Sequence, residues 1–396
     1  MDLDRLRALD AADPLARFRD AFALPEGVIY MAGNSLGPPP RAAAARLGEV
    51  VSAEWGAELV AAWTRRAWID APARVGAKIA PLIGARANEV IVADSTSVNL
   101  FKLLAAALAA RPERRTVLTV QDDFPTDLYV AGGAMGLLAD RTMVRAPRTG
   151  LAAAIGEDVA VVVLSHAHYR SGEVHDMAAV NAAARAAGAW TLWDLSHSTG
   201  VIEVDLDGSG ADLAVGCGYK YLNGGPGAPA YLYVAERLQP LLQNPVSGWM
   251  GHAAPFDFAG DYRPAEGVRR FLAGTPPMLS LLALETALDA AAGAEPAALA
   301  AKARRLGDVF LELMAERCPA LQLACPGPGE VRGGHVAFRH PQAPAFSDRL
   351  AVKGLVGDVR PPDLLRFGLS PLYLRYEDVG LAVQRIEAAL AADGVA

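Results

Sequence analysis

The chain has 396 residues, more than one hydrophobic core usually serves, so we expect a large domain with a smaller companion. A formal charge of −7 without a long Lys/Arg run argues against a nucleic-acid-binding protein. The apolar stretches are strand-sized, well short of the roughly 18 residues of a membrane span, and the acidic N-terminal residues do not resemble a signal peptide. We therefore expect a cytoplasmic protein with no membrane partner. Its three cysteines match neither a disulfide framework nor a zinc pattern, so we expect no metal.

Short β-rich runs alternate with alanine-rich stretches through the middle of the chain. The runs predicted as strands are 90–93, 116–120, 159–164, 190–193, 213–217 and 230–234. The stretches 98–110 and 177–187 are predicted helices between them. This alternation predicts an α/β domain in which helices cover the faces of a βαβ sheet.

The pattern changes after about residue 267. Long helical stretches at 277–292 and 296–316 precede short strands at 335–338 and 364–367. They predict a smaller α+β domain. We expect residues 51–267 to form the large domain and residues 268–396 the small one, with residues 1–50 packing against the small domain.

Residues 94–99 lie where a predicted strand ends and a predicted helix begins. Thr96 and Ser97 place hydroxyl and backbone N–H groups at that helix N-terminus, an arrangement that holds an anion such as phosphate well. Taken alone, the segment is explained equally well by an ordinary Ser/Thr helix cap.

Asp194 and Lys220 each follow an apolar strand, at the sheet edge where open α/β folds bind ligands. Alone, Asp194 is also explained by a helix cap and Lys220 by a surface charge. Together they suit pyridoxal 5′-phosphate (PLP), whose pyridinium nitrogen takes a carboxylate partner and whose aldehyde forms a Schiff base with lysine. The glycine-dense turn 224–227 lacks the spacing of a dinucleotide fingerprint, which disfavours a nicotinamide dehydrogenase.

The chain resembles the kynureninases, a family of aspartate-aminotransferase-like (fold type I) PLP enzymes, over nearly its whole length. Seven segments in order carry the resemblance: 33–37, 94–102, 124–129, 193–198, 219–227, 247–252 and 366–373. The resemblance implies a large domain with a mixed, mostly parallel sheet and a smaller α+β C-terminal domain. It also implies PLP-dependent hydrolysis of L-kynurenine to anthranilate and L-alanine.

The resemblance also implies a role for each matching residue. Lys220 would carry the Schiff base, Asp194 would contact the ring nitrogen, and His197 would lie beside the cofactor. Phe124 would stack on the ring. The other implied cofactor contacts are Thr96, Ser97, Tyr219 and Trp249 at the phosphate, with Asp127, Ser165 and Thr275 completing the shell.

On the substrate side, the resemblance implies that Arg366 receives the substrate carboxylate. The other implied substrate contacts are Asn34, Ser35, Trp63, Gly274 and Thr275. In the family Trp249 and Thr275 come from the neighbouring subunit, which implies a homodimer with shared active sites. Because Tyr219 adjoins the Schiff-base lysine, we expect it to act as the general acid and base at the substrate carbonyl.

Two positions depart from the family pattern, Gly218 where many relatives have threonine and Ala32 where an acid is frequent. Neither is expected to carry chemistry. His166 and His168 lack a third metal ligand, so we expect them to face solvent or the cofactor. Two alternatives remain: a cysteine desulfurase-like lyase using Cys325, and a catalytically silent PLP-fold binding protein.

Overall fold

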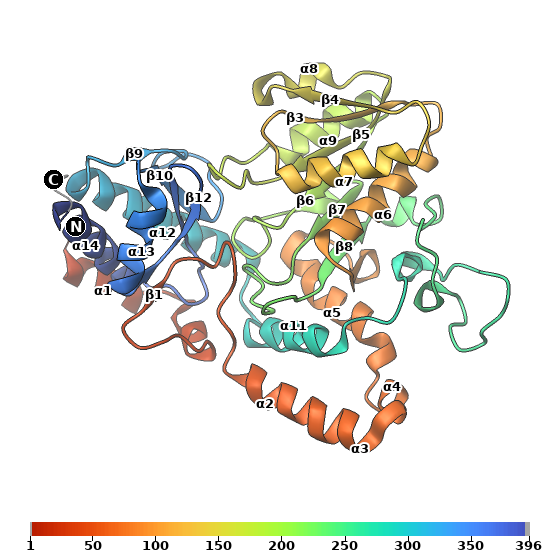
Figure 1. The fold of residues 1–396 in the computed structure, drawn as a ribbon, viewed down its shortest axis with the longest axis horizontal. Helices are drawn as coiled ribbons and strands as arrows, with labels where there is room; N and C mark the ends of the chain where they lie inside the picture. The colour runs from red at the N-terminus through yellow and green to blue at the C-terminus, as the bar shows by residue number, and fades with distance from the viewer. Residues whose placement is uncertain (1, 393–396) are drawn as a thin grey trace.

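The computed structural model describes residues 2–392, which form two regions around separate sheets (Figure 1). The larger sheet has seven strands in the order β2-β8-β7-β6-β5-β3-β4. Its strands are β2 Val90–Ala93, β3 Thr116–Val120, β4 Thr142–Ala146, β5 Val159–Ser165, β6 Trp190–Asp194, β7 Leu213–Gly216 and β8 Ala230–Val234. β8 alone runs opposite to the other six strands of this sheet. The predicted mixed, mostly parallel sheet is therefore confirmed.

Both faces of this sheet are buried along its central strands, because successive residues of these strands point into different hydrophobic clusters. On β5, Val162 and Leu164 face one cluster while Val161 and Val163 face the other. The first face is covered by α5 Ala71–Ile79, α9 Met177–Ala186 and α11 Met278–Ala290, and the second by α6 Thr96–Ala109 and α7 Pro125–Gly136. Short helices α8 Leu151–Ala154 and α10 Leu206–Ser209 complete the connections.

The smaller sheet is antiparallel, with strand order β12-β13-β10-β9. Its strands are β9 Gln322–Leu323, β10 His335–Arg339, β12 Asp358–Arg360 and β13 Leu364–Gly368. The helices around it are α1 Leu3–Ala11, α12 Pro296–Arg317, α13 Ala343–Val352 and α14 Tyr376–Ala392. A short strand β1, Ile29–Tyr30, pairs in parallel with β11, Leu355–Val356, and ties the N-terminal residues to this region.

The hydrophobic clusters show where one core gives way to the next. Leu6, Phe18 and Met31 from the N-terminal segment lie in the cluster around the small sheet. Leu281 and Leu284 of α11 lie in the cluster of the large sheet, and the small-sheet cluster resumes at Ala294. The core therefore changes between α11 and α12, whereas the division of the chain at residue 267 stays a prediction.

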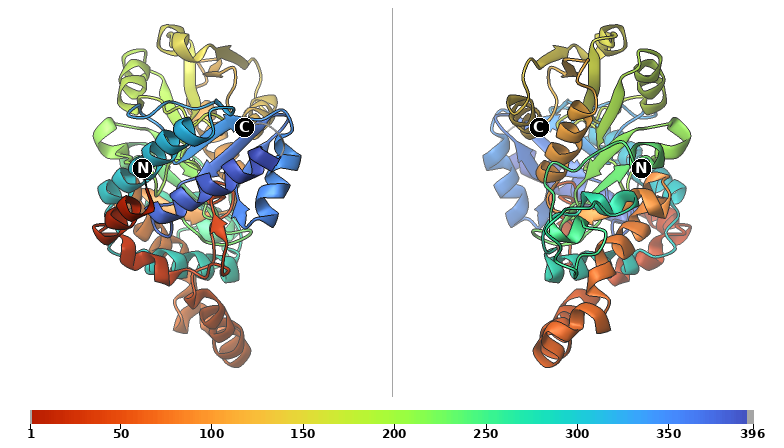
Figure 2. Two further views of the ribbon diagram at one scale, coloured as in Figure 1. Left: turned by 90° about the vertical axis from the view of Figure 1, so that its left-hand side faces the viewer. Right: turned by 90° about the vertical axis from the view of Figure 1, so that its right-hand side faces the viewer.

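Residues 42–65 form an arm that projects from the body of the molecule (Figures 1 and 2). It consists of α2 Ala42–Glu49, a π-helical turn Val50–Trp55, and the short helices α3 Gly56–Glu58 and α4 Ala62–Arg65. Trp55 is 55% exposed and Val60 81% exposed on this arm. Within residues 2–392, no helix combines the length and apolar character that a membrane crossing requires.

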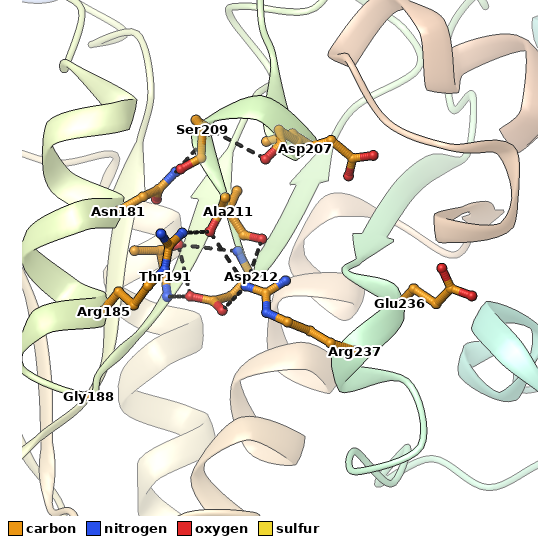
Figure 3. Close-up of polar contacts among 12 residues, drawn as sticks. Asn181, Arg185, Gly188, Thr191, Asp207, Ser209, Ala211, Asp212, Glu236 and Arg237 are labelled. Atoms are coloured by element: carbon orange, nitrogen blue, oxygen red, sulfur yellow. Dashed lines mark hydrogen bonds and ion pairs between the residues drawn. The ribbon is translucent and has the colours of Figure 1, made fainter.

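The amino-terminal edge of the large sheet is closed by a satisfied polar network around Asp212 (Figure 3). Asp212 Oδ2 accepts hydrogen bonds from the Thr191 backbone N–H at 2.8 Å and from the Thr191 hydroxyl at 3.3 Å. Its other oxygen pairs with Arg237 at 2.5 Å. This network joins β6, β7 and the residues after β8, so its role is to stabilise the fold.

Candidate active site

Lys220 and His197 meet at the carboxyl-terminal edge of the large sheet. The Lys220 Nζ atom lies 3.1 Å from His197 Nε2. Burial lowers the pKa of His197 well below its usual value, and the positive charges of Lys220 and Arg366 lower it further. The imidazole is therefore neutral at neutral pH, and its Nε2 atom can accept a hydrogen bond from the Lys220 side chain.

The other lysines of the chain are engaged elsewhere or exposed. The sequence has five lysines. Lys78 pairs with Glu285 and Asp289, Lys102 with Asp94, and Lys302 with Asp13. The fifth, Lys353, is exposed at the end of α13. Lys220 is half-buried, with its amine beside a neutral histidine and the Tyr219 ring, and is the amine best placed to react.

Three carboxylates gather near Lys220. Asp194 is the last residue of β6, and its neighbour on β5 is Ser165. Asp123 follows β3 and accepts backbone N–H groups from Phe124 at 2.7 Å and Ser165 at 3.1 Å. Asp127 lies on the first turn of α7, where burial, followed by the negative charge of Asp194, raises its pKa well above the usual value. The negative charges of Asp194 and Asp123 both disfavour ionisation of Asp127, so the three acids are crowded.

Several polar atoms at this edge are buried without a hydrogen-bond partner among the described residues: Asp127 Oδ2, Ser165 Oγ and His197 Nδ1. Buried polar groups without partners are rare in folded proteins, so such a cluster indicates room for a polar ligand. A ligand with a protonated ring nitrogen for the carboxylates and an aldehyde for Lys220 would match these groups. PLP has both, and the residues present fit it.

The start of α6 provides the groups predicted for a phosphate. The residue that caps this helix is Ser95, whose Oγ accepts the Val98 N–H at 3.3 Å. The ordinary cap therefore does not use the hydroxyls of Thr96 and Ser97, which are half-buried. Both remain available for an anion at the helix N-terminus.

Phe124 and Tyr169 contact each other beside the site, with ring centroids 5.2 Å apart in an edge-to-face arrangement. Tyr219 precedes Lys220 directly and is half-buried. Burial raises the pKa of Tyr219, and the neighbouring Cys217 and Asp194 raise it further. The phenol therefore stays protonated at neutral pH and can donate a proton or a hydrogen bond.

The small sheet contributes a buried cationic group to the same region. Arg366 is fully buried on β13 and donates Nε–H to Asp358 Oδ1 at 2.8 Å and Nη2–H to the other oxygen. Its Nη1 donates to the carbonyl of Tyr169, which follows β5 of the large sheet, and its Nη2 lies 3.3 Å from the Ser35 hydroxyl. Asn34, fully buried next to Ser35, has no partner for either side-chain polar atom within residues 2–392.

Other predicted site residues lie apart from this group. Trp63 and Trp249 contact each other edge-to-face, with centroids 6.2 Å apart, and Trp249 also contacts Phe256. Gly274 and Thr275 are exposed. Among residues 2–392 of one chain, no hydrogen bond, ion pair or ring contact joins any of these four to Lys220.

Sequence reasoning missed several residues of the site: Asp123, Tyr169, His335, Asp358 and Arg360. His335 of β10 lies against His197, with ring centroids 5.7 Å apart. A signal for Asp358 and Arg360 exists, since two charges alternate around Val359 just before a Pro-Pro pair, but a three-residue strand is too short to recognise.

The two histidines considered as metal ligands are both buried, so the expectation that they face solvent is wrong, and each has another polar contact. His166 Nδ1 lies 2.9 Å from the Ser198 hydroxyl, and His168 Nε2 lies 2.9 Å from the Asp122 carbonyl. Across the described part of the chain, no group of three or more His, Cys, Asp or Glu side chains is arranged to hold a metal ion.

Comparison with known proteins shows that the chain is similar in sequence to kynureninases. Residues 299–386 match the model of the kynureninase C-terminal domain. A kynureninase of Deinococcus radiodurans is 52% identical, covering 98% of this chain and 97% of its own length. A kynureninase of Pseudomonas fluorescens is 46% identical, covering 95% of this chain and 92% of its own length.

Solved structures of lower identity share the fold. The cysteine desulfurase CsdA of Escherichia coli has a TM-score of 0.79 at 19% identity, covering 96% of this chain and 98% of its own. A C-DES mutant with glycine covalently linked to its PLP cofactor has a TM-score of 0.78 at 16% identity, covering 91% and 97%. At such identities the likeness concerns the fold, which is that of PLP enzymes of fold type I.

Proposed function

The chain belongs to the kynureninase family, and we propose which of its residues carry out the family's reaction, the hydrolysis of L-kynurenine to anthranilate and L-alanine. The observation that carries the proposal is the meeting of Lys220 with a neutral His197 beside three crowded carboxylates. Arg366, on the facing domain, supplies a cation for an amino-acid substrate.

We propose PLP as the cofactor. It fits the unpartnered polar atoms at the sheet edge, and related folds bind it. When bound, it would supply an electron sink for the electrons released at the substrate α-carbon. The residues proposed to hold it are Lys220, Asp194, Asp127, Ser165, His197, Phe124, Thr96, Ser97 and Tyr219, with Trp249 and Thr275 from the partner subunit.

Asp194 and Lys220 would have complementary tasks. The carboxylate of Asp194 favours a positive charge beside it, because opposite charges at close range stabilise the protonated form of a base. The amine of Lys220 would take the proton from the substrate α-carbon. The neutral His197 imidazole, 3.1 Å away, can orient this amine through a hydrogen bond without repelling it.

Tyr219 would act as the general acid and base at the substrate ketone. Because burial keeps its phenol protonated, Tyr219 can donate a proton to the ketone oxygen as water adds to the carbonyl carbon. The phenolate left behind would take the proton that the added water loses. When the carbon–carbon bond breaks, the same phenol would donate a proton to Cβ and recover one from a hydroxyl of the hydrate. A role at the phosphate is compatible with this one.

Arg366, Ser35 and Asn34 would bind the amino-acid end of the substrate. Guanidinium matches a carboxylate with two parallel hydrogen bonds. Ser35 already contacts Arg366 Nη2 at 3.3 Å. The two unpartnered side-chain atoms of the buried Asn34 lie on the same loop and are available to a polar ligand.

We propose a homodimer with active sites shared between subunits. The arm exposes Trp55 and Val60, and the loop after Trp249 exposes Phe256 at 52% and Phe258 at 78%. Large exposed apolar side chains gathered in this way mark interfaces. A partner at this surface would also give the exposed Thr275 and Gly274 something to contact.

We propose kynurenine rather than 3-hydroxykynurenine as the preferred substrate, on the pattern of Trp63, Gly274 and Thr275. Trp63 and Trp249 present apolar rings, and glycine has no side chain to pair with a hydroxyl. A phenolic hydroxyl desolvated without a partner is disfavoured.

The desulfurase alternative needs a reactive, mobile thiolate. Burial raises the pKa of Cys325, the one cysteine that is not fully buried, which lowers its thiolate fraction. Cys217 and Cys318 are buried. These observations favour kynurenine hydrolysis over cysteine chemistry.

The proposed function is tested with purified protein stripped of cofactor. L-Kynurenine should give fluorescent anthranilate after PLP is restored, and none before. Equal anthranilate release with and without PLP would overturn the cofactor, while release of sulfide from cysteine without anthranilate from kynurenine would favour the desulfurase.

A further inference from the structure

Arg366 has one edge already engaged within the protein. Its Nε and Nη2 atoms donate to the two oxygens of Asp358, which is the cross-strand neighbour of Arg366 on β12. A guanidinium has five N–H groups on two forks. The fork formed by Nε and Nη2 is therefore occupied by a charged partner. The fork formed by Nη1 and Nη2 has neutral partners, the Tyr169 carbonyl and the Ser35 hydroxyl, and a substrate carboxylate binding there would replace them.

Asp358 is itself held from three sides. Ser35 donates its hydroxyl to Oδ2, and Arg360 Nη1 lies 3.2 Å from the same oxygen. Arg366, Arg360 and Ser35 together lower the pKa of Asp358 despite its burial, which raises it. The group of Asp358, Arg360, Arg366 and Ser35 thus carries two positive charges and one negative charge, which leaves one positive charge for one substrate carboxylate.

We infer that Asp358 is a positioning residue that turns Arg366 so that its Nη1/Nη2 fork faces the substrate carboxylate. Asp358 does not touch the substrate in this arrangement. Asp358 accepts hydrogen bonds from the Nε/Nη2 fork and thereby stops the guanidinium from rotating. The inference deepens the proposed role of Arg366 and rests on it.

A positioning role and a purely electrostatic role of Asp358 predict opposite effects of Asp358→Asn on the binding of a carboxylate. Removing a negative charge between two arginines would by Coulomb attraction alone tighten the binding of an anion. An amide, however, offers one acceptor and one donor, so it can satisfy only one of the two N–H groups and leaves the guanidinium free to turn. Positioning therefore predicts weaker carboxylate binding.

The test uses holoenzyme and two probes, the product L-alanine and its neutral analogue L-alaninamide, as competitive inhibitors. Asp358→Asn should raise the inhibition constant of L-alanine at least about tenfold, the loss expected for a charge-assisted contact. That of L-alaninamide should change less than about twofold, since it has no carboxylate to bind. Asp358→Asn should change the inhibition constant of L-alanine much less in an Arg366→Lys background. If Asp358 acts through Arg366, the effects of the two substitutions are not additive.

Asp358→Glu provides a second variant in case the amide does not fold. It keeps the charge but lengthens the side chain, so weaker L-alanine binding in this variant also supports positioning. Asp212→Asn is the matched control, since Asp212 likewise pairs with an arginine but lies at the amino-terminal edge of the large sheet, away from the proposed site (Figure 3). It should lower stability and leave the L-alanine constant unchanged.

Unchanged or tighter L-alanine binding in both Asp358 variants overturns the inference, as does equal weakening of L-alanine and L-alaninamide. The proposed role of Arg366 has its own test in the same series. If Arg366→Lys leaves L-alanine binding unchanged, the carboxylate site itself is wrong and the positioning role falls with it. If Arg366→Lys weakens binding and the Asp358 variants do not, only the positioning role fails.

Discussion

His166 stands edge-on against the indole of Trp193, with ring centroids 5.8 Å apart, beneath the carboxyl edge of the large sheet. His175 contacts the same indole at 6.3 Å. Burial lowers the pKa of His166 from 6.5 to about 4, and burial with the charge of Arg148 lowers that of His175 to about 3. Both rings are therefore neutral wherever the protein is folded near neutral pH.

These two histidines predict acid sensitivity. Their folded-state pKa values lie below the unfolded value, so the unfolded chain binds more protons between pH 6.5 and about 4. The stabilisation is complete above pH 6.5 and is lost as pH falls toward the folded values. Each histidine should lower the free energy of unfolding by up to about 1.4 kcal/mol per pH unit within that window.

Urea unfolding of wild type and His175→Gln at pH 5 and pH 7.5 measures this contribution. The difference between the two proteins removes the contributions of the carboxylates, among which those with a raised pKa, such as Asp123 and Asp127, have the opposite sign. The wild type should lose more stability than the variant on going to pH 5. Equal losses would show that His175 does not titrate as proposed.

Arg366→Lys should lower kcat/KM for L-kynurenine at least about 100-fold, the equivalent of roughly 2.7 kcal/mol. Lysine cannot form two parallel hydrogen bonds to a carboxylate, and it cannot reproduce the paired contact with Asp358. PLP should stay bound, as its absorption spectrum would show. Near-normal kinetics with an intact circular dichroism spectrum would place the carboxylate site elsewhere.

The parts of this protein that could be predicted are those with a strong local pattern. Six strands of the large sheet and its PLP-type fold follow from buried β-rich runs such as 159–164 and from the order of the motifs. The β4 strand was missed because it is largely exposed and lies at the sheet edge. The partner of Arg366 was missed for another reason, since Asp358 meets it only through the pairing of two short strands. A buried arginine predicts a partner but does not say whether that partner is a substrate or the protein.

Mixed dimers test the shared site. Inactive Lys220→Ala subunits mixed with Thr275→Ala subunits should regain activity, because one of the two sites in a heterodimer then combines an intact Lys220 with an intact Thr275. Subunit exchange is confirmed by tagging each variant and purifying the mixed species. No recovery in a confirmed heterodimer would contradict a Thr275 contribution from the partner.

Steady-state kinetics with the two substrates test the apolar pocket. We expect a higher kcat/KM for kynurenine than for 3-hydroxykynurenine, since a hydroxyl that loses water without gaining a partner weakens binding. Trp63→His would give the hydroxyl a polar neighbour and should narrow the difference. A wild-type preference for 3-hydroxykynurenine would mean that Trp63, Gly274 and Thr275 do not define the pocket as proposed.

The most direct test of the site is to find which lysine carries the cofactor. Holoenzyme is reduced with borohydride, digested, and examined by mass spectrometry for the phosphopyridoxyl group. The expected result is a single modified peptide containing Lys220, with Lys220→Ala losing both the visible absorption and anthranilate formation while the exposed Lys353→Ala retains both. Modification of Lys102 or any lysine other than Lys220, or a reducible linkage that persists in Lys220→Ala, would contradict the proposed site.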